Sequence, residues 1–246
     1  MIALWCLHGF LGNGGDWVFL EEALSREGGI RIHRPDLLAA PGEVRSFPYW
    51  ARKFNARAAG AEGTPILLGY SMGGRLALHC LLQPGAPWRG AVLVSAHPGL
   101  DSEEERRERL ARDETWARRF EEDPWEEILA DWNSQPVFQG RNPLPARREA
   151  DFSRQALARA LRVWSLGNQG PLLERLHQLE VPLLWIAGRE DPPYLRLGER
   201  AARGNRRIRF VSLPGAGHRL PWEAPLPFLR QVRDFLGEVP EDPHST

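Results

Sequence analysis

The stretch that decides the fold is residues 66–75, Ile-Leu-Leu-Gly-Tyr-Ser-Met-Gly-Gly-Arg. It begins with a short, continuous apolar run at residues 66–69, which is typical of a strand covered on both faces of a parallel sheet. Residues 73–82 then have the apolar spacing of a helix. Glycines flank Ser71 because a tight strand-to-helix turn leaves space only for small side chains. The pattern predicts a serine hydroxyl above the sheet, beside the backbone N–H of Met72.

Strand and helix patterns alternate on both sides of this stretch. The other apolar runs are short and bounded by Gly, Pro or polar residues, and they lie at residues 2–7, 91–95, 183–187 and 209–213. Helical spacing occurs between and beyond them, at residues 17–27, 47–61, 195–203 and 228–236. This alternation predicts right-handed crossovers and an α/β fold, with a mostly parallel central sheet flanked by helices.

One segment, residues 101–178, breaks the alternation with helical patterns and no convincing strand. Residues 101–122 carry 15 charged side chains, nine acidic and six basic, which is typical of a solvated helix with many ion pairs. Aromatic side chains occur among the charges, including Trp116, Phe120, Trp125, Trp132, Phe138 and Trp164. We interpret the segment as a helical cap inserted into a core of residues 1–100 and 179–237, with a flexible tail at 238–246.

The composition of the 246-residue chain argues against several classes of protein. Hydrophobic residues make up 42% and charged residues 26%, which is unlike disordered or fibrous chains. Basic and acidic residues number 32 each, so charge gives no reason to expect a nucleic acid or a membrane surface as a partner. Cys6 and Cys80 lie in apolar runs, which favours reduced thiols. Since no signal segment or membrane span is visible, we expect a cytoplasmic protein, either a monomer or a weak homo-oligomer.

Two later strand ends supply partners for the serine. A serine that acts as nucleophile or base needs a histidine to accept its proton and a carboxylate to orient that histidine. The expected order along the chain is serine, acid, histidine. The run at 183–187 is followed by Gly-Arg-Glu-Asp, which makes Asp191 the predicted acid and Glu190 its competitor. The last run is followed by Pro-Gly-Ala-Gly-His, which makes His218 the predicted base.

A fourth element follows the first apolar run, at Leu-His-Gly-Phe, residues 7–10. The glycine allows the backbone to turn, so that the N–H of Phe10 and the N–H of Met72 can point to one place. Two such donors stabilise a developing oxyanion by about 3–4 kcal/mol each in comparable sites. The pattern predicts an oxyanion hole, with His8 in a structural role.

Together these elements resemble the α/β-hydrolase superfamily over essentially the whole chain. Four segments narrow the resemblance to the MenH family of 2-succinyl-6-hydroxy-2,4-cyclohexadiene-1-carboxylate synthases: LHGFLG at 7–12, GYSMGGR at 69–75, HPGL at 97–100 and DWNSQPVF at 131–138. The first two are superfamily motifs, whereas the last two, in and around the cap, are much more specific. An arginine-rich helix between them also resembles the family. Residues 35–42 depart from it, because PDLLAAPG stands where many relatives have a Gly-His-Gly stretch.

The resemblance implies a lyase of menaquinone biosynthesis that eliminates pyruvate from 2-succinyl-5-enolpyruvyl-6-hydroxy-3-cyclohexene-1-carboxylate. In that reaction Ser71, activated by His218 and oriented through Asp191, removes a carbon-bound proton next to the succinyl ketone. The amides of Phe10 and Met72 hold the resulting oxyanion. Neither a cofactor nor a metal is implied. The alternative is a carboxylesterase or thioesterase that uses the same triad with water.

The resemblance also places five residues among the substrate contacts: Tyr70, Arg75, Arg109, Trp132 and Arg154. Three arginines suit a substrate with three carboxylates, because the guanidinium fork pairs with a carboxylate through two parallel N–H donors. A small neutral ester needs no such cations, so the arginines favour the lyase. The open alternatives are a surface helix position for Arg75, a solvated charge for Arg109 and a place in the cap core for Trp132. For Arg154 the alternative is an insertion at residues 139–145 that shifts its register with the family.

Overall fold

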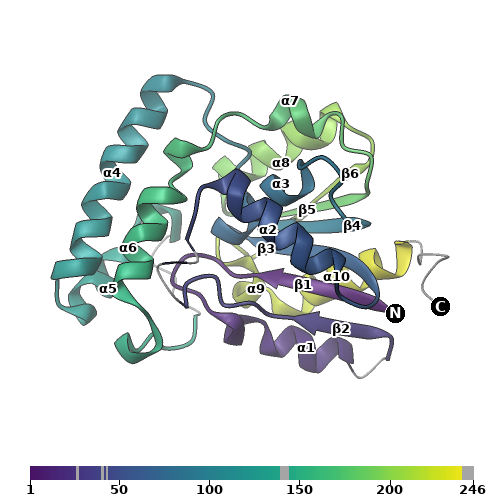
Figure 1. The fold of residues 1–246 in the computed structure, drawn as a ribbon, viewed down its shortest axis with the longest axis horizontal. Helices are drawn as coiled ribbons and strands as arrows, with labels where there is room; N and C mark the ends of the chain where they lie inside the picture. The colour runs from purple at the N-terminus through teal and green to yellow at the C-terminus, as the bar shows by residue number, and fades with distance from the viewer. Residues whose placement is uncertain (26–27, 40–41, 43, 139–143, 240–246) are drawn as a thin grey trace.

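A six-stranded parallel sheet forms the centre of the molecule, in the order β2-β1-β3-β4-β5-β6 (Figure 1). The computed structural model describes residues 1–25, 28–39, 42, 44–138 and 144–239. The strands are β1 (Ile2–Leu7), β2 (Ile30–His33), β3 (Thr64–Tyr70), β4 (Gly90–Val94), β5 (Leu183–Gly188) and β6 (Ile208–Leu213). The predicted α/β fold with a parallel sheet is confirmed, and every predicted strand is present.

The sequence did not reveal β2, the strand at the edge of the sheet. Three of its four residues are half-buried, and Arg31 is exposed. It pairs only with β1, in a register that places Ile30 opposite Ile2. An edge strand with one charged side chain lacks the continuous apolar run by which the interior strands were recognised.

Helices cover both faces of the sheet because successive side chains of a strand point to opposite sides. Leu4 and Cys6 of β1 pack in one cluster with α1 (Val18–Leu24) and α10 (Pro225–Glu238). Trp5 and Leu7 pack in the other cluster, with α2 (Phe47–Ala59), α3 (Met72–Leu81) and α8 (Pro192–Gly204). These are the five helices predicted for the core. Residues 26–27, at the end of the first predicted helix, lie outside the described residues, as do residues 240–246 of the predicted tail.

The helical segment stands at the carboxyl end of the sheet. Its main helices are α4 (Glu103–Glu122), α5 (Trp125–Asn133) and α6 (Arg154–Val163), which lie together at the left of Figure 1. Between residues 101 and 178 the described part of the chain contains helices and turns but no strand. The last helix of the segment, α7 (Leu173–Leu176), packs against α8 of the core. The segment therefore returns to the core at about residue 170.

The two ends of this helical segment meet at one place. The backbone N–H of Leu172 donates to the Pro98 carbonyl at 2.6 Å, and Gln169 Nε2 donates to the His97 carbonyl at 2.7 Å. The Gln169 residue is fully buried. These bonds close the base of the segment, so the two chain connections between its helices and the core run together in a single stem.

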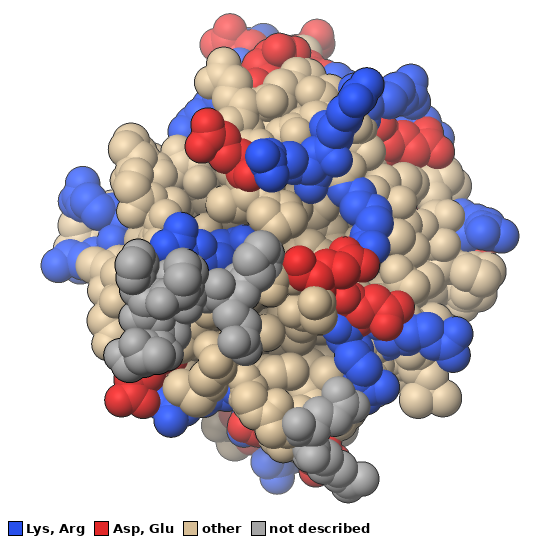
Figure 2. Space-filling view, turned by 90° about the vertical axis from the view of Figure 1, so that its right-hand side faces the viewer, with Lys and Arg blue, Asp and Glu red and all other residues tan. Residues whose placement is uncertain are grey.

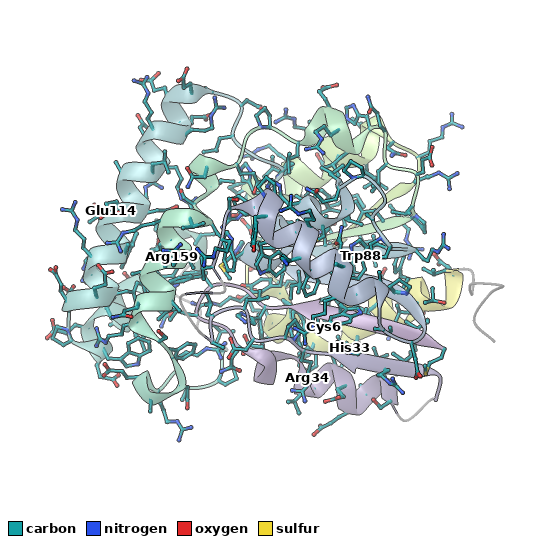
Figure 3. The ribbon with its side chains drawn as sticks, in the orientation of Figure 1. Cys6, His33, Arg34, Trp88, Glu114 and Arg159 are labelled. Atoms are coloured by element: carbon teal, nitrogen blue, oxygen red, sulfur yellow. The ribbon has the colours of Figure 1, made fainter. Side chains whose placement is uncertain are left out.

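The helices of the segment are held together by ion pairs. Arg162 of α6 binds Glu114 and Glu121 of α4, at 2.8 and 2.7 Å. Figure 3 shows Glu114 on α4 and Arg159 on α6, and Arg159 Nε donates to the Val44 carbonyl before α2 at 2.8 Å. The segment is thus tied both internally and to the core.

The surface opposite α4–α6 carries basic and acidic side chains interspersed with each other (Figure 2). Cys6 and Cys80 are buried and free. Within the described residues, none of the helices combines the length and hydrophobicity that a membrane crossing requires.

Half-buried His79 makes the stability of the fold sensitive to acid. Its ring stacks on Phe47 with centroids 4.3 Å apart, and among the described residues its Nε2 has no hydrogen-bond partner. Burial, together with repulsion from Arg75, lowers the pKa of His79 from 6.5 to about 4. Between these values the unfolded chain binds the extra proton and the folded chain does not. Stability is therefore full above pH 6.5 and falls as the pH drops to 4, by about 1.4 kcal/mol per pH unit for this group.

We expect His79→Phe to reduce the slope of the unfolding free energy against pH by the contribution of about one proton. Phenylalanine keeps the stack on Phe47 but does not titrate. Urea unfolding of both proteins at pH 7.5, 6.5, 5.5 and 4.5 measures the difference in slope. His97 provides a reference, because burial and Arg75 also lower its pKa to about 4, and it remains in the variant. Parallel stability curves for the two proteins would contradict the assignment.

Candidate active site

Ser71 occupies a strained turn between β3 and α3. Its φ is 51° and its ψ is −110°, a conformation that costs a residue with a Cβ about 1–3 kcal/mol. The Ser71 N–H donates to the Val94 carbonyl at 2.9 Å, and its carbonyl accepts from Arg75 at 3.0 Å. At Gly73 a Cβ would overlap the carbonyl oxygen of Leu7. The glycine therefore allows α3 to start close to β1, and the turn lifts the serine above the sheet.

The three predicted triad residues come together at the carboxyl end of the sheet. Ser71 Oγ lies 3.0 Å from His218 Nε2, and His218 Nδ1 lies 2.8 Å from Asp191 Oδ2. The histidine and the aspartate are only 4% and 3% exposed. Asp191 directly precedes α8, whose first residue, Pro192, has the fixed φ that suits a helix start. The geometry favours Asp191 over Glu190 as the partner of the histidine.

The backbone at Phe10 and Met72 has the geometry of a donor pair. Both residues line the same cavity as Ser71. Among the described residues no carbonyl accepts from the N–H of either one. Met72 is the first residue of α3, so its N–H has no partner within the helix. These two donors are free to bind an oxyanion.

His8 holds the loop that carries Phe10. It is fully buried, and its Nε2 accepts from the Leu37 N–H at 2.9 Å. Its Nδ1 lies 2.8 Å from the Gly9 carbonyl, and with Nε2 accepting, Nδ1 is the protonated nitrogen. His8 therefore links two loops and does not reach the serine. None of the described residues of the 35–42 loop lines the cavity over Ser71, and residues 40–41 lie outside the described chain.

A cavity of about 340 Å³ opens over Ser71 and His218. The core supplies the floor, and α4, α5 and α6 supply the walls. Its described lining includes three arginines and one acid, namely Arg75, Arg109, Arg112 and Asp113. The cavity is thus positively charged above the serine.

Arg75 and Arg109 are each held by one hydrogen-bonded partner that leaves other N–H donors of the guanidinium unbonded among the described residues. Arg75 Nη1 donates to the Trp164 carbonyl at 2.6 Å. Burial, with repulsion from Arg109, lowers the pKa of Arg75 to about 10, so the group stays charged at neutral pH. Arg109 Nε donates to both oxygens of Asp113 at 2.8 Å, and its two Nη groups have no partner among the described residues. Both arginines can therefore bind an anion in the cavity.

Trp132 and Tyr70 line a second, smaller compartment of about 50 Å³ that shares Ser71 and Phe10 with the main cavity. Trp132 lines both spaces, and the centroid of its ring lies 4.7 Å from the centroid of the Phe10 ring. Tyr70 lines only the smaller one and packs against Trp222 at 5.1 Å. Burial raises the pKa of Tyr70, so its hydroxyl stays protonated. An ion pair between Arg147 and Asp16, at 2.7 Å, forms part of the wall of this compartment.

Arg154 is the one predicted contact that the structure does not bring to either compartment. Its Nη1 donates to the carbonyls of Phe120 and Asp123 at 3.0 and 2.8 Å, and its Nε pairs with Glu149. It therefore caps the carboxyl end of α4, where free carbonyls and the helix dipole favour a cation. We do not retain it as a substrate contact.

Sequence reasoning missed Tyr194 and Arg112, which both line the cavity. The Tyr194 ring lies 4.5 Å from that of His218, and burial raises its pKa, so its hydroxyl remains a donor. Each had a local signal. Tyr194 comes three residues after the predicted acid, and Arg112 comes three residues after Arg109 on a helix, where such pairs share a face.

The parallel sheet, the strained serine turn and the hydrogen-bonded Ser71, His218 and Asp191 define an α/β hydrolase. The family model described as "Alpha/beta hydrolase family" matches residues 6–231, and the chain belongs to this family. Within it, the chain belongs to the family of the 2-succinyl-6-hydroxy-2,4-cyclohexadiene-1-carboxylate synthases. The enzyme of this name from Pectobacterium atrosepticum is 32% identical over 96% of this chain and 94% of the relative. The one from Serratia proteamaculans is 32% identical over 94% and 91%.

Solved structures agree with this placement. A structure described as MenH from S. aureus superposes with a TM-score of 0.87, at 25% identity over 96% of this chain and 93% of that chain. A thermophilic esterase from Thermogutta terrifontis has a TM-score of 0.74 at 24% identity, over 97% and 90%. The esterase shares the fold, and the MenH structure superposes more closely.

Proposed function

We propose that this protein eliminates pyruvate from 2-succinyl-5-enolpyruvyl-6-hydroxy-3-cyclohexene-1-carboxylate, giving 2-succinyl-6-hydroxy-2,4-cyclohexadiene-1-carboxylate for menaquinone biosynthesis. The observation that carries the proposal is the cavity over Ser71, in which three guanidiniums face one carboxylate. A substrate with three carboxylates complements such a site, whereas a small neutral ester would leave the cations without partners. The curated relatives of the same name support the same reaction.

The triad performs a proton abstraction in this reaction. Ser71 Oγ, hydrogen-bonded to His218 Nε2, removes the ring proton next to the succinyl ketone while His218 takes the hydroxyl proton. The ketone oxygen becomes an enolate, which the N–H groups of Phe10 and Met72 stabilise. Asp191 stabilises the imidazolium through Nδ1.

Collapse of the enolate expels the leaving group. The electron pair moves into the ring, the existing double bond shifts, and the carbon–oxygen bond to the enolpyruvyl group breaks. This gives the 2,4-diene, and enolpyruvate gains a proton at its methylene carbon to become pyruvate. His218 can supply that proton, because it holds the one taken from the serine. No water is consumed and no acyl-enzyme forms.

The test supplies the enolpyruvyl substrate to the purified protein and follows pyruvate release with a coupled assay. A neutral nitrophenyl ester is assayed in parallel under the same conditions. Rapid pyruvate release with slow ester hydrolysis is the expected result. Efficient ester hydrolysis without pyruvate release would favour the esterase or thioesterase instead.

Arg75→Ala and Arg109→Ala should each raise the KM for the enolpyruvyl substrate about ten- to a hundredfold, since a hydrogen bond to a charged group contributes about 1.5–3 kcal/mol. Hydrolysis of the neutral ester should change little, because that molecule has no carboxylate. Arg154→Ala is the matched control, since it removes a cap of α4 and not a cavity cation.

Steady-state kinetics with both substrates measure these effects, and thermal unfolding reports damage to the fold. The Arg109 variant leaves Asp113 buried with Ser165 as its remaining partner, so its melting temperature should fall more than that of the Arg75 variant. Equal loss of activity toward both substrates would indicate structural damage instead of lost recognition.

A further inference from the structure

We propose that Arg112 of α4 is a further substrate-binding residue, which binds a carboxylate from the outer part of the cavity. This inference rests on the proposed function, because it assigns the third cation to a substrate with three carboxylates. It gives to Arg112 the place that the resemblance to the family gave to Arg154.

The face of α4 that meets the cavity carries Arg109, Arg112 and Trp116. Residues at spacings of three, four and seven lie on one side of a helix, so these side chains reach the same space. Arg112 is exposed to solvent, while Arg109 is 31% exposed. Arg112 therefore stands nearer the mouth, and Arg109 stands deeper.

Arg112 differs from its neighbours in its lack of partners. Arg118 pairs with Glu114, and Arg119 pairs with Asp123 and Asp131. Within the described chain, no carboxylate or carbonyl binds the Arg112 guanidinium. All five of its N–H donors are available to a ligand.

The charge balance of the main cavity favours this third cation. Asp113 is the only acid among the described residues of the lining, and it is already bound by Arg109 and by the Ser165 hydroxyl at 2.7 Å. Without Arg112, two guanidiniums and one bound carboxylate would face three substrate carboxylates. With it, the main cavity is lined by three guanidiniums, as many as the substrate has carboxylates.

The helix that carries Arg112 is fixed relative to the serine. Arg162 of α6 binds Glu114 and Glu121 on the outer side of α4. The Trp164 carbonyl, just after α6, accepts from Arg75 of α3, the helix that starts beside Ser71. These contacts form a continuous path from α4 to α3, so the backbone that carries Arg112 is held in place before binding, which lowers the entropic cost of recognition.

The experiment compares Arg112→Gln with Arg107→Gln. Arg107 is the matched control, because it is exposed on the same helix and does not line the cavity. We expect Arg112→Gln to raise the KM for the enolpyruvyl substrate about tenfold or more, with kcat within about threefold of wild type, and Arg107→Gln to change neither. Both variants should unfold at the wild-type temperature, since neither side chain has a hydrogen-bond or ion-pair partner among the described residues.

A second measurement does not depend on turnover. Propane-1,2,3-tricarboxylate is titrated against the fluorescence of the protein, because Trp116 and Trp132 line the cavity. Its dissociation constant should rise about tenfold in the Arg112 variant only, and the difference should shrink at high salt. A merely structural role for Arg112 would not produce this salt dependence.

The outcomes separate the two proposals. If the wild type releases pyruvate, and Arg112→Gln and Arg107→Gln both keep the wild-type KM and the wild-type affinity for the probe, Arg112 is not a substrate contact. The proposed function then stands. If the wild type releases no pyruvate but binds the probe through Arg112, the anion site stands and the proposed function fails. A wild-type protein that neither turns over nor binds the probe contradicts both.

Discussion

Ser71→Ala is expected to lower kcat for pyruvate release by about 10²–10⁴-fold, the range by which a positioned general base contributes. The hydroxyl lies 3.0 Å from His218 Nε2, so in our mechanism it is the atom that removes the ring proton. Since His218 acts through this hydroxyl in our mechanism, the variant has no group to remove the proton from carbon. The KM should change little, because the arginines of the cavity are untouched. Steady-state pyruvate release measures the effect.

The fold should tolerate this substitution, because alanine keeps the Cβ and therefore the same strained φ of 51°. Ser71→Gly is an informative control. It removes the hydroxyl and also relieves the strain, so it should be as inactive as the alanine variant but unfold at an equal or higher temperature. An alanine variant that kept more than about a tenth of wild-type turnover would show that Ser71 is not the base.

Asp191→Asn should cost up to about 10⁴-fold in kcat, as the loss of the orienting carboxylate does in other Ser-His-Asp sites. Asp191 Oδ2 accepts from His218 Nδ1 at 2.8 Å, and both groups are buried. An asparagine amide can present an N–H there and stabilise the wrong tautomer, with Nε2 protonated and unable to accept from Ser71. It also no longer balances the imidazolium that forms during proton abstraction.

Glu190→Gln is the control for this prediction, because Glu190 is the adjacent acid on the same turn. We expect it to keep kcat within a few-fold of wild type. Measuring both variants at several pH values distinguishes a lost tautomer from a shifted titration, since a lost tautomer lowers the plateau of the pH profile. A larger loss in the glutamine variant would reverse the assignment of the acid.

The parts of the site that could be predicted from the sequence are those set by local geometry. A serine between a buried strand and a helix, and an acid and a histidine after two later strands, must meet if the strands are parallel neighbours. Ser71, Asp191 and His218 do meet, at the carboxyl ends of β3, β5 and β6. Phe10 and Met72 follow from the same rule, because β1 is adjacent to β3.

The cap residues could not be placed in the same way. In α4 charged side chains occur on nearly every side, so periodicity does not reveal which face meets the cavity. The placement of Arg154 among the substrate contacts depended on the alignment register across residues 139–145, of which 139–143 lie outside the described chain. Only tertiary contacts show which arginine lines the cavity. Arg154 binds carbonyls at the end of α4, whereas Arg112 lines the cavity.

The single stem at Pro98 and Leu172 bears on how such a protein can diversify. An insertion whose two ends are already bonded together adds little strain to its host, and the entropy of closing a longer loop rises only slowly with length. Segments of different size and composition can therefore be exchanged at this position while the sheet and its serine stay intact. The reacting groups belong to the host and most of the selective contacts belong to the insertion, so proton abstraction and substrate choice can evolve separately on one scaffold.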